Sequence, residues 1–400
     1  MNNRPFMMII ADDLTGALDS GAQLIRRGLD VAILTRVPSR QELESITATD
    51  VISVDTETRH IDADQAYDLV YRLTTDALAV GITTIYKKTD SGLRGNIGAE
   101  LTAVLDASKK DHLNFIPAYP ATGRTTIHGV HFVNGKPLSQ SIFATDPIDP
   151  VKYSRIDDLI HQQSDVPVYS FHPSGRGICV FDASTDDDMK KIATQLKENN
   201  DLAITAGCAG FLEFYPLEHS KDISPHSLKL PSKLLAFCGS VNHVSRMQIA
   251  CAVKAGVPLI SIPEEELRAR SYDTCQILTQ LHCHAQEPIV LVDTSSAQTA
   301  IPVQGSTAAL IAEQLGMIAR QLTLAQPDRL MMIIGGDTLL GFVRAMHVNK
   351  LIPVQEIFPG VVLALYKNGN ETKYLITKSG GFGEEDQMLK VLDWLKNTER

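Results

Sequence analysis

The sequence predicts an α/β protein of two domains, each a mostly parallel sheet flanked by helices, with the active site in the cleft between them. Two observations support this fold class. Short apolar runs alternate with helical stretches along both halves of the chain, and a polar stretch near residue 230 interrupts the alternation once. The length of 400 residues suits two or three domains with their own cores. We place the domains at residues 1–230 and 231–400.

The first half contains repeated strand–helix units. The stretch Thr15–Arg27 has apolar residues at helical spacing, and Gly28 follows where a helix would end. Residues 118–150 are rich in Gly, Pro and Thr without clear periodicity, which predicts a long ordered surface segment beside a site. The predicted strands are Met7–Ile10, Val31–Thr35, Val51–Val54, Thr83–Tyr86 and Leu113–Pro117, and the predicted helices are Thr15–Arg27, Asp64–Leu78 and Ile97–Ala107.

The pattern restarts after His219–Lys233, a stretch of Ser, Pro, Asp and Lys that is typical of a linker. The strands predicted in this half are Leu234–Cys238, Leu259–Ile262, Ile289–Asp293, Leu330–Ile334, Val361–Tyr366 and Tyr374–Thr377. The predicted helices are Asn242–Ala255, Ser271–His282, Ser306–Leu322 and Glu385–Trp394.

Composition excludes several classes of protein. A formal charge of −10 and a pI near 5.6 argue against a nucleic-acid surface, although a local cluster of cations can still bind ATP. No apolar run approaches the roughly 18 residues of a membrane span. The six cysteines are scattered singly, and the tract His282–His284 has no second cluster to complete a metal site. We therefore expect a cytoplasmic protein with reduced thiols and no nucleic-acid or membrane partner.

Two adjacent carboxylates, Asp12 and Asp13, follow the first predicted strand. Open α/β sheets bind ligands at the carboxyl ends of their strands, and paired acids there suit substrate hydroxyls or a metal ion. The alternative is that Asp13 or Thr15 only caps the next helix. Capping accounts for one acid but not for both, so we favour a functional role.

A dense polar turn follows the fourth predicted strand and contains Lys88, Thr89, Asp90 and Arg94. An arginine suits bidentate recognition of a carboxylate or phosphate, and a lysine supplies a compact charge. A solvated charged turn is the alternative, but the helix expected next adds N–H groups that favour anions. Arg59, after the third strand, is equally compatible with an ordinary surface salt bridge, and Gly123–Thr126 is similarly ambiguous.

Glycine-rich turns are concentrated in the second half. One contains Gly335, Gly336, Asp337 and Thr338, and another spans Thr377–Gly383. Glycines let backbone N–H groups approach phosphate oxygens, and a nearby acid or hydroxyl can hold Mg²⁺. Tight turns alone can also require glycine, but two such turns in one domain favour nucleotide binding. The Gly-Ser turn at residues 239–240 suits either a phosphate or a helix cap.

These segments, in this order, resemble the four-carbon acid sugar kinase family: Ala11–Ala17, Lys87–Asn96, Gly335–Thr338 and Thr377–Gly383. The resemblance runs from the first strand to the last helix. It implies ATP-dependent phosphorylation of the terminal hydroxyl of a four-carbon sugar acid. D-threonate, giving 4-phospho-D-threonate, is the substrate that we expect first, with D-erythronate, L-threonate and 3-oxo-tetronate as alternatives. Gly92 departs from the threonine expected at its position in many relatives.

The resemblance also implies site residues. An acid-sugar site would consist of Asp13, Arg59, Lys88, Thr89, Asp90 and Arg94. A nucleotide site would consist of Ser240, Gly335, Gly336, Asp337, Thr338, Gly360, Gly380 and Gly381. The residue chemistry agrees with this division, because the cations cluster in the first domain and the glycine turns in the second.

The implied reaction is in-line phosphoryl transfer with charge neutralisation by Mg²⁺ and protein cations. Asp13 and Asp90 are candidate bases, and Asp337 is a third candidate that could equally hold the metal. The metal ligands and the oligomeric state, a homodimer included, stay open. An NAD-dependent oxidoreductase is an alternative that lacks its usual G-x-G-x-x-G fingerprint here. A non-catalytic sugar-acid binding protein is another, but it needs no glycine-rich nucleotide site.

Overall fold

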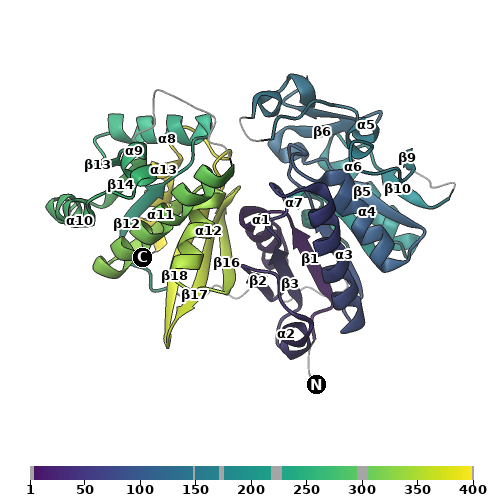
Figure 1. Ribbon diagram of the computed structural model, residues 1–400, viewed down its shortest axis with the longest axis horizontal. Helices are drawn as coiled ribbons and strands as arrows, with labels where there is room; N and C mark the ends of the chain where they lie inside the picture. The colour runs from purple at the N-terminus through teal and green to yellow at the C-terminus, as the bar shows by residue number, and fades with distance from the viewer. Residues whose placement is uncertain (1–3, 147–148, 171–174, 218–227, 295–304, 399–400) are drawn as a thin grey trace. The chain divides into compact units, whose positions relative to one another are not determined.

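The structure is a computed structural model that describes residues 4–146, 149–170, 175–217, 228–294 and 305–398 (Figure 1). The chain divides into two compact units, Met1–Ile223 and Ser224–Arg400. The division falls within the stretch that the sequence indicates as a linker, most of which lies outside the described residues.

Unit 1 is built on a parallel sheet of eight strands in the order β2-β3-β1-β4-β11-β5-β10-β9. The central strand β1 is buried at every residue, as expected for a parallel strand covered on both faces. The strands are β1 (Met7–Ala11), β2 (Val31–Leu34), β3 (Val51–Asp55), β4 (Thr84–Lys88), β5 (His112–Ile116), β9 (Val168–Ser170), β10 (Gly177–Val180) and β11 (Ile204–Gly207).

Helices cover both faces of this sheet (Figure 1). Helices α3 and α4 pack against the face formed by alternate residues such as Met8 and Ile52. The opposite face meets α1, where the Ser53 hydroxyl donates to the Ala17 carbonyl (3.0 Å). The helices are α1 (Leu14–Ile25), α2 (Arg40–Ser45), α3 (Ala63–Ala79), α4 (Ile97–Ser108), α5 (Ile156–Ile160), α6 (Asp186–Glu198) and α7 (Ala209–Phe214).

Residues 118–146 contain more regular structure than the sequence predicts. A small antiparallel sheet joins β6 (Arg124–Ile127), β7 (Val130–Val133) and β8 (Lys136–Pro137), and the short helices η1 (Pro120–Thr122), η2 (Leu138–Gln140) and η3 (Ile142–Thr145) flank it. Tight turns at Gly129 and Gly135 with positive φ connect these strands. Strands this short show too few residues for a clear period in the sequence.

Unit 2 repeats the architecture with seven strands in the order β13-β14-β12-β15-β18-β17-β16. The first five are parallel, whereas β16, β17 and β18 form antiparallel pairs. The strands are β12 (Lys233–Cys238), β13 (Leu259–Ile262), β14 (Ile289–Thr294), β15 (Arg329–Ile334), β16 (Lys350–Phe358), β17 (Val361–Asn368) and β18 (Glu371–Lys378).

Helices also cover both faces of the second sheet. Helices α8 and α13 contribute to the core formed with residues such as Ala236 and Met332. Helices α11 and α12 pack tightly on each other, since a Cβ on Gly316 would lie 2.1 Å from the Gly341 backbone. The helices are α8 (His243–Lys254), α9 (Glu264–Ala269), α10 (Thr274–Cys283), α11 (Gly305–Ala325), α12 (Gly336–Ala345) and α13 (Gln387–Thr398). No described helix is both long and apolar enough to cross a membrane.

The strand order places a ligand site in each unit. In unit 1 the chain runs from β1 to one side of the sheet and returns to β4 on the other side; in unit 2 it does the same around β12 and β15. Such switch points open a crevice at the carboxyl ends of the two strands, where α/β proteins bind ligands. The predicted fold class, two units with mostly parallel sheets flanked by helices, is confirmed. The cleft between the domains stays a prediction.

Candidate active site

The polar turns of unit 1 meet at its switch point. Ala11, the last residue of β1, lies in register with Asp55 of β3 and Lys88 of β4. Asp12 and Asp13 therefore leave the sheet beside Lys88. Asp13 caps α1, because its carboxylate accepts from Gly16 N (2.8 Å), so the capping and functional interpretations of this residue are compatible.

Arg59 is central to this cluster. Its Nε donates to Asp12 (2.8 Å), its Nη1 to Asp13 (2.9 Å), and its Nη2 lies 3.6 Å from an Asp90 oxygen. The side chain is largely buried, so these contacts are shielded from water and salt. The alternative interpretation of Arg59, as part of an ordinary surface salt bridge, is therefore wrong.

Asp90 and Arg94 form a bidentate ion pair within the turn that joins β4 to α4. Arg94 donates from Nε to Oδ2 (2.8 Å) and from Nη2 to Oδ1 (2.9 Å) of Asp90, and its Nη1 reaches Asp146 (2.9 Å). Burial alone would raise the pKa of Asp90, but Arg94 and Arg59 outweigh it and hold that pKa well below its usual range. Asp90 is therefore ionised at neutral pH.

Asp13 has a similar electrostatic environment. Burial favours its neutral form, but Arg59 and Lys88 outweigh burial and lower its pKa to about 2. The Thr15 hydroxyl also donates to its Oδ2 (2.6 Å). The side chain of Asp13 is 22% exposed against 10% for Asp90, so Asp13 is the more accessible of the two carboxylates.

Three buried polar atoms at this edge have no hydrogen-bond partner among the described residues: Oδ1 of Asp12, Oδ2 of Asp55 and Oγ1 of Thr89. Nζ of Lys88 donates to the Thr89 carbonyl (2.8 Å), which is its one hydrogen bond in the described structure. Buried polar atoms are normally paired, so atoms left over at a strand-end crevice indicate room for a ligand. A ligand here would meet both acceptors and donors.

A buried ion pair supports this site from behind. Lys87 Nζ lies 3.0 Å from Glu100 Oε2, and both side chains are fully buried. Lys87 also donates to the Ile10 carbonyl (3.2 Å), and the Thr58 hydroxyl donates to Glu100. This network ties α4 to the end of β1 and to the segment that carries Arg59. It fixes the position of that arginine.

Two site neighbours, Phe143 and Asp146, were not predicted from the sequence. The Phe143 ring lies under Arg94, at 5.1 Å from the guanidinium carbon, and under Arg124 at 5.9 Å. The ring fits because residue 92 is glycine; a Cβ there would lie 2.6 Å from it. Asp146 pairs with Arg94 as described above. Phe143 and Asp146 belong to the aperiodic segment 118–150, where only its position beside a site was predicted.

The glycine turns of unit 2 also converge. A Cβ on Gly335 would lie 3.2 Å from Ser240 Cβ, and one on Gly380 would lie 2.5 Å from Ser240 Oγ. Gly335 has φ +107°, which favours glycine, and α12 begins at Gly336 directly after it. A Cβ on Gly239 would lie 2.2 Å from Thr338 Oγ1. The structure thus brings the predicted turns after β12, β15 and β18 together around Ser240.

The remaining predicted nucleotide residues border these turns. The Gly360 carbonyl accepts from Ser379 N (3.1 Å), which fixes the turn that contains Gly380 and Gly381. Asp337 is an exposed side chain in the first turn of α12. No group of three or more potential ligand side chains among the described residues could hold a metal ion on its own.

An arginine–aspartate pair beside Ser240 was missed. Arg246 donates from Nη1 to both oxygens of Asp293 (2.7 and 2.5 Å) and from Nη2 to the Ser240 carbonyl (2.5 Å). Burial raises the pKa of Asp293, although Arg246 opposes the rise. Asp293 could have been predicted as a site residue, because it is an acid at the end of β14 and β14 ends at the same sheet edge as β12.

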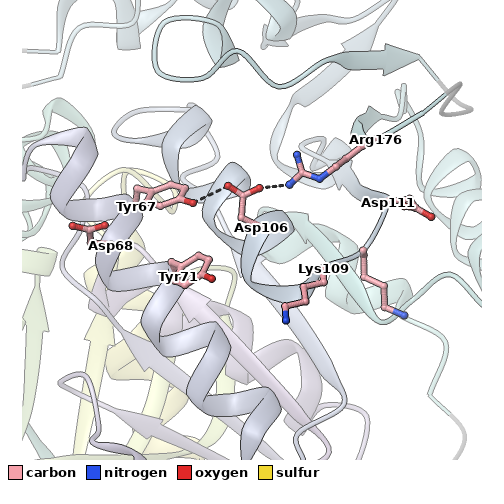
Figure 2. Close-up of a pocket in the computed structure, with 8 residues that line it drawn as sticks. Tyr67, Asp68, Tyr71, Asp106, Lys109, Asp111 and Arg176 are labelled. Carbon is pink, nitrogen blue, oxygen red and sulfur yellow. Dashed lines mark hydrogen bonds and ion pairs between the residues drawn. The ribbon is translucent and has the colours of Figure 1, made fainter.

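A cavity of about 670 Å³ lies elsewhere in unit 1. It is lined by residues of α3, of the end of α4 and of the α4–β5 connection, among them Tyr67 and Asp106, and by Arg176 before β10 (Figure 2). Tyr67 donates to Asp106 (2.7 Å), which also pairs with Arg176. This connection precedes β5, at the sheet edge opposite the carboxyl ends. No predicted site residue lines this cavity.

Comparison with known proteins identifies both units. Residues 7–215 match the family model of a sugar-binding N-terminal domain, and residues 235–388 match that of a nucleotide-binding C-terminal domain. The chain is 29% identical to a D-threonate kinase of Salmonella typhimurium, with 98% of each chain covered. It is 26% identical to a D-erythronate kinase of Heliobacterium modesticaldum (97% of each covered) and to a 3-oxo-tetronate kinase of Pseudomonas fluorescens (98% of each).

Solved structures agree on the fold. A Haemophilus influenzae protein aligns with a TM-score of 0.69 at 21% identity, over 98% of this chain and 100% of that one. A Salmonella typhimurium protein aligns with a TM-score of 0.73 at 20% identity, over 96% and 98%. The chain is therefore a two-domain sugar-acid kinase with separate sugar-binding and nucleotide-binding domains. It belongs to the four-carbon acid sugar kinase family, and the predicted resemblance is confirmed.

Proposed function

We propose that this kinase phosphorylates the terminal hydroxyl of D-threonate with ATP, giving 4-phospho-D-threonate. One observation supports a polyhydroxylated acid in particular: the unit 1 cluster mixes cations and carboxylates instead of being uniformly basic. Hydroxyl groups donate to carboxylates, whereas a substrate carboxylate accepts from Arg59, Lys88 or Arg94. The choice of D-threonate follows the Salmonella relative.

Asp13 is the proposed proton acceptor. It is the more exposed of the two ionised carboxylates, and Asp90 is occupied by both Nε and Nη2 of Arg94. A pKa near 2 makes Asp13 a weak base. Phosphoryl transfer tolerates this, because in its loose transition state little of the proton has left the attacking hydroxyl. Asp90 then serves to orient Arg94.

The nucleotide occupies the unit 2 turns in this proposal. The backbone around Gly335 and Gly380 approaches phosphate closely, and Thr338 supplies a hydroxyl. Mg²⁺ commonly binds through one or two protein carboxylates and the phosphates of the nucleotide. The exposed Asp337, at the first turn of α12, fits that mode, and the bound ion would supply charge neutralisation. Transfer further requires that the two ligands come within bonding distance during the reaction.

An ADP-release assay over a panel of acids tests the substrate. The panel contains D- and L-threonate, D- and L-erythronate and 3-oxo-tetronate. We expect kcat/KM for D-threonate to exceed that for each other acid at least about tenfold, one well-placed hydrogen bond being worth about 1.5 kcal/mol or more when a charged group is involved. A higher value for D-erythronate or 3-oxo-tetronate would reassign the substrate within the family.

Asparagine variants test the base. Asp13→Asn is expected to lower kcat by about 10²- to 10⁴-fold, the usual contribution of a positioned acid or base. Asp90→Asn is expected mainly to raise KM for the acid, because it releases Arg94. The exposed Asp64→Asn serves as the matched control. Wild-type kcat in Asp13→Asn would rule this residue out as the proton acceptor.

A further inference from the structure

Lys378 lies within the nucleotide turns of unit 2. It is the last residue of β18 and sits in register with Ile334 of β15, which is in turn in register with Cys238 of β12. Its carbonyl accepts from Gly335 N (3.0 Å). The residue therefore joins two of the glycine turns directly, and its side chain shares a sheet face with Cys238, the residue two places before Ser240.

The ammonium group of Lys378 is buried without a counter-ion. The residue is 1% exposed, and the one hydrogen bond of its ammonium group in the described structure goes from Nζ to the Ser379 carbonyl (2.9 Å). No carboxylate of the described residues forms an ion pair with it. Asp293, which is in register with Cys238, accepts hydrogen bonds from Arg246 through both carboxylate oxygens. A charged group in this position is normally paired.

Burial without a counter-ion lowers the proton affinity of the Lys378 side chain. Burial lowers the pKa of Lys378 from 10.5 to about 8, and the Cys238 thiol opposes the shift only weakly. A purely structural tether to the Ser379 carbonyl would not need a charge, since a neutral amide or hydroxyl can also donate to it. An unpaired cation among phosphate-type turns is accounted for if its partner is an anion that arrives with the ligand.

We propose that Lys378 is a phosphate-binding residue of this kinase and that its ammonium contacts the di- or triphosphate of the nucleotide. The inference rests on the proposed placement of the nucleotide in unit 2 and assigns the buried cation at its glycine turns, with which no carboxylate of the described residues forms an ion pair. Lys378 was absent from the site predicted from the sequence, although Thr377–Gly383 was recognised as a turn. Lysine acts on phosphate as a point charge, so no bidentate geometry is required.

Nucleotide titrations separate this role from a structural one. ADP and adenosine are titrated calorimetrically into the wild type, Lys378→Met and Lys378→Arg, with Lys367→Met as the matched control, an exposed lysine on the neighbouring β17. Lys378→Met is expected to weaken ADP about 10- to 100-fold, as for loss of one charged hydrogen bond, and to leave adenosine within about twofold. Lys378→Arg keeps the charge and is expected to retain most of the ADP affinity, and Lys367→Met all of it.

The alternative outcomes are distinct. Equal losses for ADP and adenosine in Lys378→Met would mean that the lysine only shapes the turn, and unchanged ADP affinity would mean that it does not contact phosphate; either result overturns the assignment alone. Absence of ADP binding by the wild type, with its fold verified by circular dichroism, would overturn the proposed nucleotide site together with the lysine.

Discussion

Replacing Lys87 by Met tests the energetics of the buried pair behind the acid-sugar site. Met has a similar length but leaves Glu100 fully buried without its cation. Burial already raises the pKa of Glu100 above its usual 4.5, even though Lys87 opposes it. In the variant the carboxyl is expected to be protonated in the folded state at neutral pH, as isolated buried glutamates are.

The magnitude follows from linkage. Keeping the carboxyl protonated at pH 7, when the unfolded chain ionises near pH 4.5, costs about 3.4 kcal/mol at 1.36 kcal/mol per pH unit, and about 0.7 kcal/mol at pH 5. Because the pKa of this carboxyl is higher in the folded than in the unfolded state, its contribution to stability is most favourable below the unfolded-state pKa and declines as pH rises. Loss of the Lys87 hydrogen bonds adds about 1 kcal/mol at either pH.

Hydrogen exchange measures this difference. Global protection of peptides from β4 and α4 at pH 5 and pH 7, corrected for intrinsic exchange rates, gives the free energy of opening of unit 1. Because wild-type Glu100, with its raised pKa, already bears part of this cost, Lys87→Met is expected to lose at most about 4 kcal/mol at pH 7 and about 2 kcal/mol at pH 5. The double variant Lys87→Met/Glu100→Met removes the pH-dependent part, and Lys152→Met controls for an exposed lysine. A loss of equal size at both pH values would refute the reasoning.

Three further predictions concern single residues. Lys378→Met should stabilise the nucleotide-free protein by about 2 kcal/mol at pH 7, as measured by urea unfolding. The lysine pKa, lowered from 10.5 to about 8, disfavours folding by about 3 kcal/mol below pH 8, and the variant is relieved of this cost. Loss of the lysine hydrogen bond offsets about 1 kcal/mol of that gain. The gain should vanish as pH approaches 10.5, and a destabilised variant would contradict it. Gly335→Ala, at φ +107°, should weaken ADP at least about fivefold through about 1 kcal/mol or more of backbone strain, with D-threonate KM unchanged; wild-type ADP affinity in a titration would contradict it. Gly92→Ala should displace the Phe143 ring from Arg94 and raise the acid KM several-fold while the ATP KM stays constant; steady-state kinetics showing the reverse split would mean that the ring does not support the acid-sugar site.

Much of the site was predictable because strand ends in a parallel sheet meet at one edge. Once Met7–Ile10 and Thr83–Tyr86 are recognised as strands, the polar residues after each must lie near that edge, whatever their separation in the sequence. Asp13 and Lys88 are 75 positions apart and yet influence each other electrostatically. The same rule brought Gly335 and Gly380 to Ser240. Their roles in binding and catalysis stay predictions.

The residues that were missed share a different property. Strand β11 lies between β4 and β5 although it comes much later in the chain, and nothing local in its four residues reveals that position. Phe143 approaches Arg94 from a segment without periodicity. Arg246 reaches Asp293 from a helix across a strand end. Each depends on a tertiary contact, which local patterns of hydrophobicity do not encode.

The two sites differ in how the charges of Arg59 and Arg94 on one side and of Lys378 on the other are balanced. In unit 1, Arg59 and Arg94 are already paired with carboxylates, so the cations are held in position at little cost before any ligand arrives. A sugar acid must then compete with Asp12, Asp13 and Asp90 for donors, which limits affinity but favours ligands that offer hydroxyl donors in return. In unit 2, Lys378 lacks such a carboxylate. Under the phosphate-binding proposal, the unpaired charge of Lys378 lowers the stability of the empty unit 2 and strengthens nucleotide binding. The paired cations of unit 1 instead lower affinity for the sugar acid and raise selectivity for hydroxylated ligands.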